Sequence, residues 1–505
     1  MLLSALIHAL GLPPLAGADA AITGLCYDSR RVTSGALFVA IAGYHVDGAA
    51  YLGDAFRRGA AAAVAETEKR EQLEPVAAAY GRRLIGVDDP RAALATLAAT
   101  WFGYPARELV TIGVTGTDGK TTTSYLISTV LEAAGHRSGL FSTAAFKIGA
   151  AWEENDSRQT TPEALEVQQL LRRMVQAGAS HAVLESTSHG LELHKLDHCE
   201  YDVAVFTNLS PDHLDFHGTV DAYAAAKARL FAMLDLSIDK GVPKLAVLNA
   251  DDPASARMAA ATRASRLTYG IDAAADVRAR EIDLQPDGSA LLLQTPAGTV
   301  RTRLGLPGRF NVANALAAAA VAIGLGIAPA VIAGGLESFA GVPGRMQRLD
   351  AGQPFTVIID YAHTAASFQK VLETLRPLTH GRLIAVFGCA GERGGERRTG
   401  MGAVAARSAD YAVLTSEDPR GEDPAAIVGE IAEAMIAAGA CEGRQFERQI
   451  DRRAAIARAF SLARSGDLVL LTGKGHEHSI QTPQGSLPWD EASVARSLLT
   501  GSGGA

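Results

Sequence analysis

Residues 115–123, TGTDGKTTT, have the composition of a phosphate-binding loop. Two glycines allow the backbone to turn with its N–H groups inward, Lys120 can reach terminal phosphates, and Thr121 can offer a hydroxyl to Mg²⁺. The apolar run LVTIGVTG leads into the loop, and TTTSYLISTVLEAAG, with helical spacing, continues from it. A strand, a glycine turn and a helix in this order predict ATP binding, because the helix N-terminus faces the anion. The predicted ATP-binding residues here are Gly116, Thr117, Asp118, Gly119, Lys120, Thr121 and Thr122.

Two later segments carry groups that could hold a metal ion. Glu185 closes the apolar run HAVLE, and α/β sheets place ligand groups at the ends of parallel strands. We therefore expect Glu185 to hold Mg²⁺; the alternative is a carboxylate paired with a nearby base. The second segment, FTNLSPDHLDFHG, contains Asp212, His213, Asp215 and His217 within six positions. His213 is the expected second metal contact.

Lys227 lies in DAYAAAKARLF, a segment with the spacing of an amphipathic helix. Taken by itself, a lysine in such a helix is interpreted as part of a solvated face.

A phosphate loop alone fits kinases, GTPases, motors and ligases. A GTPase would carry Asn-Lys-x-Asp after a later strand, and the sequence contains no such motif. The reaction must therefore be read from residues outside the loop.

Composition limits the classes of partner. The chain has 505 residues with 48% hydrophobic and 20% charged residues, and its net charge of −8 does not favour nucleic acid binding. The apolar N-terminus has no lysine or arginine before Arg30, so no secretory signal is expected. Residues 313–336 are uncharged, but glycines and a proline interrupt them, which predicts two short buried helices and no membrane insertion. The four cysteines are widely spaced, and we expect a cytoplasmic protein with reduced thiols.

The pattern of apolar runs predicts an α/β chain with three domains. Pro105 and the charges after it mark a boundary near residue 107, and GVPGRMQRL marks a second one near residue 343. The predicted domains are residues 1–107, 108–343 and 344–505. The central domain is expected to contain a mostly parallel sheet, and the last domain a second parallel sheet built from runs such as RLIAVFGC and DLVLLTG.

Together these motifs resemble those of the Mur ligases, ATP-dependent enzymes that build the peptide stem of peptidoglycan. The likeness is greatest to the branch that adds the third residue, and it covers nearly the whole chain. The motifs that carry it are YDSRRV, TGTDGKTTT, TTPEALE, ESTSHGLELHK, FTNLSPDHLDFHG, AAAKARLF, PGRFNVANALAA, GVPGRMQ, DYAHT, GCAGERGGERR, EDPRGEDP and GKGHE.

The resemblance implies a uridine-nucleotide-binding α/β domain, a central P-loop domain and a C-terminal Rossmann-like domain that closes onto it. It implies that CO₂ carbamylates Lys227, which replaces the solvated-face interpretation. The implied catalytic residues are Lys120, Lys227, His213 and Glu185. The implied Mg²⁺ ligands are Thr121, Glu185, His213 and carbamylated Lys227.

The resemblance also assigns substrate contacts by position. For the UDP-muramyl dipeptide these are Ser29, Tyr44, His45, Thr160, Thr161, Thr187 and Lys195, the last standing where an arginine is usual. For the nucleotide they are Asn311, Asn314, Arg345, Asp360 and His363. For the incoming amino acid they are Arg393, Glu417, Asp418, Arg420, Gly473 and Glu477.

The third residue is expected to be meso-diaminopimelate, since Arg420 suits a distal carboxylate. Lysine or ornithine is the alternative acceptor. Asp418 stands where diaminopimelate enzymes typically have Asn, and its negative charge would attract an ammonium group. The other interpretation is that Asp418 simply pairs with Arg420. Further alternatives are a folylpolyglutamate synthetase-like ligase and a non-catalytic nucleotide-binding relative. We expect a monomer that uses small-molecule substrates, with ATP and Mg²⁺.

Overall fold

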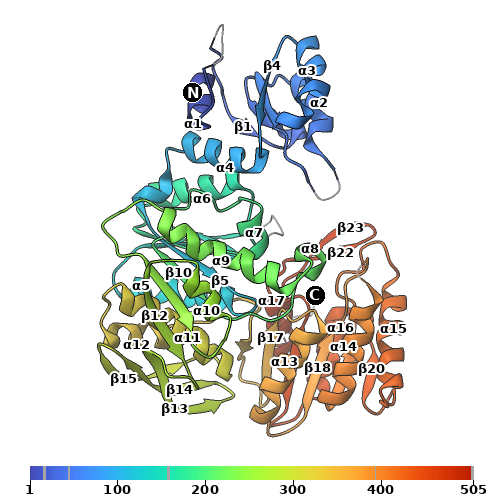
Figure 1. Cartoon of the computed structure of the whole chain (residues 1–505). Helices are drawn as coiled ribbons and strands as arrows, with labels where there is room; N and C mark the ends of the chain where they lie inside the picture. The colour runs from blue at the N-terminus through green and yellow to red at the C-terminus, as the bar shows by residue number, and fades with distance from the viewer. Residues whose placement is uncertain (15–18, 44–45, 156–159, 393, 502–505) are drawn as a thin grey trace. The chain divides into compact units, whose positions relative to one another are not determined.

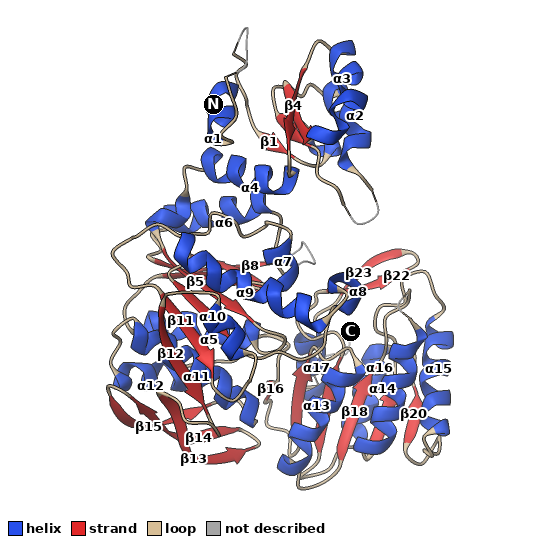
Figure 2. Ribbon diagram, viewed as in Figure 1, coloured by secondary structure: helices blue, strands red, loops and turns tan. Residues whose placement is uncertain are grey.

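A computed structural model describes residues 1–14, 19–43, 46–155, 160–392 and 394–501. The chain divides into two compact units, Met1–Val277 with Ala317–Ala328, and Arg278–Leu316 with Pro329–Ala505. Each unit combines parallel strands with helices (Figures 1 and 2). The predicted α/β class is therefore confirmed.

The N-terminal part of the first unit contains a parallel sheet in the order β1-β2-β3-β4. The segment YDSRRV, residues 27–32, follows β1 and forms no strand. The carboxylate of Asp28 accepts from the Arg30 N–H and starts a 3₁₀ helix, Ser29–Arg31. The strands are β1 Leu25–Cys26, β2 Leu37–Val39, β3 Ala62–Glu66 and β4 Arg83–Val87, and the helices are α1 Leu3–Ala9, α2 Leu52–Arg57, α3 Arg70–Ala79 and α4 Pro90–Trp101.

A second sheet of the first unit runs in the order β12-β11-β10-β5-β9-β6-β7-β8. It is parallel from β12 to β6 and antiparallel through β7 and β8. Its strands are β5 Val110–Thr115, β6 Ser138–Phe141, β7 Ala145–Ile148, β8 Ala151–Glu154, β9 His181–Glu185, β10 Val203–Phe206, β11 Leu245–Asn249 and β12 Ser265–Gly270.

Strand register brings three chain segments to one edge of this sheet. Val114 of β5 lies opposite Glu185 of β9, and Thr115 lies opposite Phe206 of β10. The phosphate loop, Glu185 and the segment after Phe206 therefore leave the sheet together, as parallel strands require. The accompanying helices are α5 Lys120–Ala133, α6 Ala164–Gln176, α7 Ser188–Glu192, α8 Leu214–His217, α9 Val220–Leu236 and α10 Ser255–Ala260.

The second unit begins with antiparallel strands, which the sequence analysis does not predict. They are β13 Val277–Gln285, β14 Gly288–Thr295 and β15 Gly298–Leu304. The uncharged stretch at 313–336 divides into α11, Arg309–Gly324, and α12, Pro329–Glu337, as predicted. Within the described ranges no helix has the length and apolar character needed to span a bilayer.

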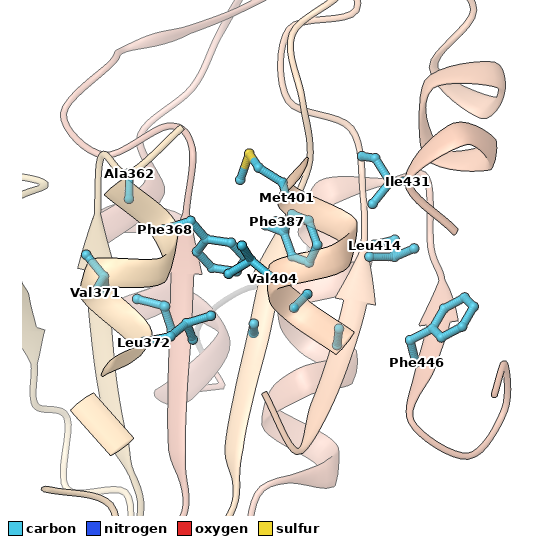
Figure 3. Close-up of a cluster of buried hydrophobic side chains, with 14 of the residues drawn as sticks. Ala362, Phe368, Val371, Leu372, Phe387, Met401, Val404, Leu414, Ile431 and Phe446 are labelled. Carbon is cyan, nitrogen blue, oxygen red and sulfur yellow. The ribbon is translucent and has the colours of Figure 1, made fainter. Parts of the chain in front are cut away.

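The C-terminal sheet follows the order β16-β17-β21-β18-β19-β20, parallel except for β16. Alternate strand residues feed two cores, so helices cover both faces. Figure 3 shows one core, where Phe368 of α13 contacts Phe387 of β18 with ring centroids 4.9 Å apart. The strands are β16 Gln347–Leu349, β17 Thr356–Asp360, β18 Leu383–Phe387, β19 Tyr411–Leu414, β20 Phe446–Arg448 and β21 Leu468–Thr472, with a hairpin of β22 Ser479–Thr482 and β23 Gly485–Pro488. The helices are α13 Ala365–Leu375, α14 Gly395–Ser408, α15 Pro424–Ala437, α16 Arg452–Leu462 and α17 Glu491–Leu499.

Candidate active site

The predicted phosphate loop joins β5 to α5 and is braced by the neighbouring strand. Gly116 has a φ of 148°, in the region that favours glycine. The Lys120 ammonium donates to the carbonyl oxygens of Gly116 and Thr117, at 3.1 and 2.8 Å. Asn208, just after β10, accepts from the Thr117 N–H at 2.8 Å and, through its side-chain oxygen, from the Asp118 N–H at 3.0 Å. Asn208 thus holds the loop through its backbone carbonyl oxygen and its side chain.

Gly116→Ala should weaken nucleotide binding strongly. An added Cβ would collide with the Thr207 hydroxyl, and its φ is strained for any other residue. Strain of about 1–3 kcal/mol corresponds to roughly ten- to hundredfold weaker binding. Calorimetric titration with ADP measures this loss. Gly429→Ala in α15, where an added Cβ meets no atom within 4 Å, is the control and should bind ADP normally.

Glu185 lies beside the Thr121 hydroxyl at the carboxyl end of β9. Its two carboxylate oxygens are 3.1 and 3.0 Å from Thr121 Oγ1. Two adjacent ligands of an octahedral Mg²⁺, each about 2.1 Å from the ion, would be about 3.0 Å apart. Thr143 donates to the same carboxylate from its N–H and its hydroxyl, at 2.9 and 3.1 Å. A buried carboxylate and a hydroxyl at this separation fit a Mg²⁺ site.

Lys227 is buried, so the interpretation from its helix alone is wrong. Its side chain is 1% exposed, and its ammonium donates to the Gly116 carbonyl oxygen at 2.6 Å and lies 4.1 Å from the Tyr223 ring centroid. Burial, with a smaller effect from the positive charge of Lys120, holds the pKa of Lys227 well below its usual range. A signal was present in the sequence: Tyr223, Lys227, Phe231 and Leu234 fall on one stripe of α9.

His213 also lies near Tyr223, in the turn before α8. The two ring centroids are 6.1 Å apart, and the His189 ring is 4.8 Å from that of His213. Burial lowers the pKa of His213. Burial, with a smaller effect from the neighbouring His213, lowers the pKa of His189 to about 4. Neutral imidazole is the form that binds metals. Within the described residues no three His, Cys, Asp or Glu side chains form a metal cluster by themselves.

Three threonines that are predicted to contact the substrate lie close to Glu185. The hydroxyls of Thr161 and Thr187 are 2.9 Å apart, and the hydroxyls of Thr160 and Thr143 are also 2.9 Å apart. Since Thr143 also donates to Glu185, the expected dipeptide contacts lie next to the expected metal ligand.

Lys195 is engaged by an acidic residue that the sequence analysis does not identify. Its ammonium lies 2.9 Å from Glu163, which also pairs with Arg91 at 3.1 Å. Glu163 belongs to TTPEALE, directly after the predicted threonines. Ser29, in contrast, sits in the N-terminal 3₁₀ helix and is 8% exposed. Tyr44, His45 and Arg393 lie outside the described residues.

The second unit brings together predicted nucleotide contacts around Tyr361. Asp360 accepts from the N–H groups of Met346 and Ala362, both at 2.8 Å, and burial raises its pKa. The guanidinium of Arg345 lies 4.6 Å from the Tyr361 ring centroid.

The remaining predicted nucleotide contacts are also in defined positions. The His363 ring is 4.6 Å from that of Tyr361. Asn311 donates to the Pro307 carbonyl oxygen at 2.8 Å and accepts from Asn314 at 3.2 Å, inside helix α11.

The predicted amino-acid-binding residues surround a buried lysine, Lys474. Asp418 pairs with Lys474 at 2.8 Å, which corrects the suggested pairing with Arg420. Glu477 pairs with the same ammonium at 2.7 Å. Burial raises the pKa of Glu417 to about 7, and Gly473 leaves room for this side chain, because an added Cβ would approach its Oε2 at 2.7 Å.

Three family models match this chain in order. The Mur ligase family catalytic domain matches residues 21–102, the Mur ligase middle domain residues 114–322, and the Mur ligase glutamate ligase domain residues 344–475. The chain belongs to the Mur ligase family. The expected three-domain Mur ligase fold is thereby confirmed, whereas the domain boundaries stay predictions.

Similar Mur ligases match along their full length. A UDP-N-acetylmuramyl-tripeptide synthetase of Roseiflexus sp. is 49% identical over 97% of this chain and 96% of its own. A UDP-N-acetylmuramoyl-L-alanyl-D-glutamate–2,6-diaminopimelate ligase of Bacillus licheniformis is 42% identical over 98% of each chain. A solved structure of a ligase with the latter name aligns over 100% of both chains, with 30% identity and a TM-score of 0.69.

A folylpolyglutamate synthase of Mycobacterium tuberculosis, at 19% identity and a TM-score of 0.61 over 76% of this chain, shares the fold. The Mur ligase assignment makes this protein an ATP-dependent, Mg²⁺-requiring ligase that acts on small molecules.

Proposed function

We propose that this Mur ligase adds meso-diaminopimelate to UDP-N-acetylmuramoyl-L-Ala-D-Glu in peptidoglycan synthesis, as a cytoplasmic monomer. The observation that carries the proposal is the convergence of Lys120, Glu185 and Lys227 around the phosphate loop. The name of the Bacillus licheniformis relative supports the choice of acceptor.

Amide formation from a carboxylate is uphill in water, so the carboxylate must be activated. An oxygen of the terminal dipeptide carboxylate attacks the γ-phosphorus of ATP, and ADP leaves. The amine of the incoming residue then attacks the acyl carbon and expels phosphate. Lys120 supplies positive charge where the two anions meet, and Thr160, Thr161, Thr187 and Lys195 orient the dipeptide.

Mg²⁺, when bound, neutralises charge on the phosphate oxygens. Thr121, Glu185, His213 and the carbamate of Lys227 would hold it.

Carbamylation of Lys227 requires a neutral amine. Its nitrogen attacks the carbon of CO₂ and loses a proton, which turns a cation into a carboxylate. The buried setting of Lys227 supports this step, because its lowered pKa increases the neutral fraction.

The remaining proposed contacts follow the family pattern. Ser29, with Tyr44 and His45, would bind the uridine nucleotide. In the second unit Asn311, Asn314, Asp360 and His363 would bind adenosine, Arg345 the γ-phosphate, and Arg393, Glu417, Asp418, Arg420, Gly473 and Glu477 the acceptor.

Lysine or ornithine is the second candidate acceptor class, favoured by the negative side chain of Asp418. An acceptor panel tests the choice. The enzyme is given ATP, Mg²⁺ and UDP-N-acetylmuramoyl-L-Ala-D-Glu with diaminopimelate, lysine or ornithine, and phosphate release and product mass are followed. We expect the highest kcat/KM with diaminopimelate; preference for a monocarboxylate would refute this choice.

A further inference from the structure

Lys474 is a fully buried cation that the mechanism above does not use. It follows β21 and is 0% exposed. Its ammonium donates to Asp418 Oδ1 at 2.8 Å and to Glu477 Oε2 at 2.7 Å. One lysine therefore contacts two of the acidic side chains proposed to face the incoming amino acid.

The surroundings of Lys474 are rich in carboxylates. Glu417 is also buried, and its Oε2 has no hydrogen-bond partner. The other buried cation nearby, Arg452, is held by Glu491 through two bonds of 2.9 and 2.6 Å. Among the residues that the structure describes, Lys474 is thus the cation paired with Asp418, and without it this buried carboxylate would lose that compensating charge.

Asp418 also fixes the backbone of the adjacent hairpin. Its Oδ1 accepts from the Gln481 N–H at 2.9 Å, and the Gln481 carbonyl oxygen accepts from the Arg420 N–H at 2.9 Å. Arg420 has a φ of 54°, a conformation that needs such support. The Lys474–Asp418 pair therefore holds the residue proposed to bind a distal carboxylate.

We propose that Lys474 determines acceptor specificity: by pairing with Asp418 it cancels the charge that would repel a second carboxylate, and it keeps Arg420 in place. This inference rests on the proposed function of the same site. It explains how an acceptor with two carboxylates is accepted although Asp418 is acidic.

The test compares the ratio of kcat/KM for diaminopimelate to kcat/KM for lysine in variants of the full chain. Lys474→Met should lower this ratio about a hundredfold, because the uncompensated charge of Asp418 repels the second carboxylate. Lys474→Met combined with Asp418→Asn should return the ratio to within about tenfold of the wild-type value, because that charge is gone. Lys474→Arg should keep the ratio within about threefold.

Lys240→Met is the matched control, since Lys240 pairs at 2.6 Å with another buried carboxylate, Asp202, and both residues belong to the first unit, whereas the acceptor residues belong to the second. It should lower thermal stability and leave the ratio unchanged.

An equal loss for both acceptors in Lys474→Met, or a double variant no better than the single one, would overturn the inference. If Lys474→Met does not fold, the double variant Lys474→Met with Asp418→Asn is the test. A ratio in this variant as low as one hundredth of the wild-type ratio would overturn the inference. A near-normal ratio would support it. A wild-type preference for lysine would instead refute the proposed third residue, and the change of ratio among variants would still decide the role of Lys474.

Discussion

Lys227→Ala should lower ligase activity by roughly a thousandfold, because the proposed carbamate, which would hold Mg²⁺ and orient the reacting groups, cannot form. Short-chain carboxylic acids should then restore part of the activity. The side chain of Lys227 is enclosed by Tyr223 and the phosphate loop, so its removal leaves a space that acetate or propionate can enter. Phosphate release in a series of acid concentrations measures both effects.

Lys120→Ala provides the control for this rescue. It should also inactivate the enzyme, but its missing group is a cation, so carboxylic acids should not help. Wild-type activity in Lys227→Ala, or equal rescue of both variants, would contradict the carbamate.

Glu185→Gln should lower kcat/KM by roughly a hundredfold and raise the Mg²⁺ concentration needed for half-maximal activity. The amide has nearly the same shape but no charge, and its nitrogen cannot accept from Thr121 and Thr143 as the carboxylate does. Mg²⁺ titrations of the ligation rate separate this effect from a simple loss of folded protein, because excess Mg²⁺ restores part of the rate in the first case.

Glu192→Gln is the matched control for Glu185. Glu192 ends α7, is half-exposed and faces Arg229 at 3.6 Å, and such surface pairs contribute little. Its Mg²⁺ dependence should equal that of the wild type. If Glu185→Gln kept the wild-type Mg²⁺ dependence, the metal-ligand role of Glu185 would be wrong.

The sequence predicts the parts of the site that lie at the carboxyl ends of parallel strands. The phosphate loop and Glu185 each follow an apolar run, and parallel pairing then forces them to one edge. The two helices within residues 313–336 are equally predictable from the glycines and proline between them.

Contacts between distant charged side chains are not predictable in this way. Asp418 and Lys474 are 56 positions apart, and no local periodicity reports their pairing. Glu163 and Lys195 pair across 32 positions for the same reason. The burial of Lys227 is hard to predict for a different reason, since alanines around it reduce the contrast between the two faces of α9.

In the proposed reaction ATP activates the dipeptide as an acyl phosphate, so one oxygen of the dipeptide carboxylate must end in the released phosphate. UDP-N-acetylmuramoyl-L-Ala-D-Glu labelled with ¹⁸O in the reacting carboxylate is ligated to the preferred amino acid, and the phosphate released is analysed by mass spectrometry. The account predicts one ¹⁸O atom in each phosphate formed. Ligation that yields unlabelled phosphate would contradict it.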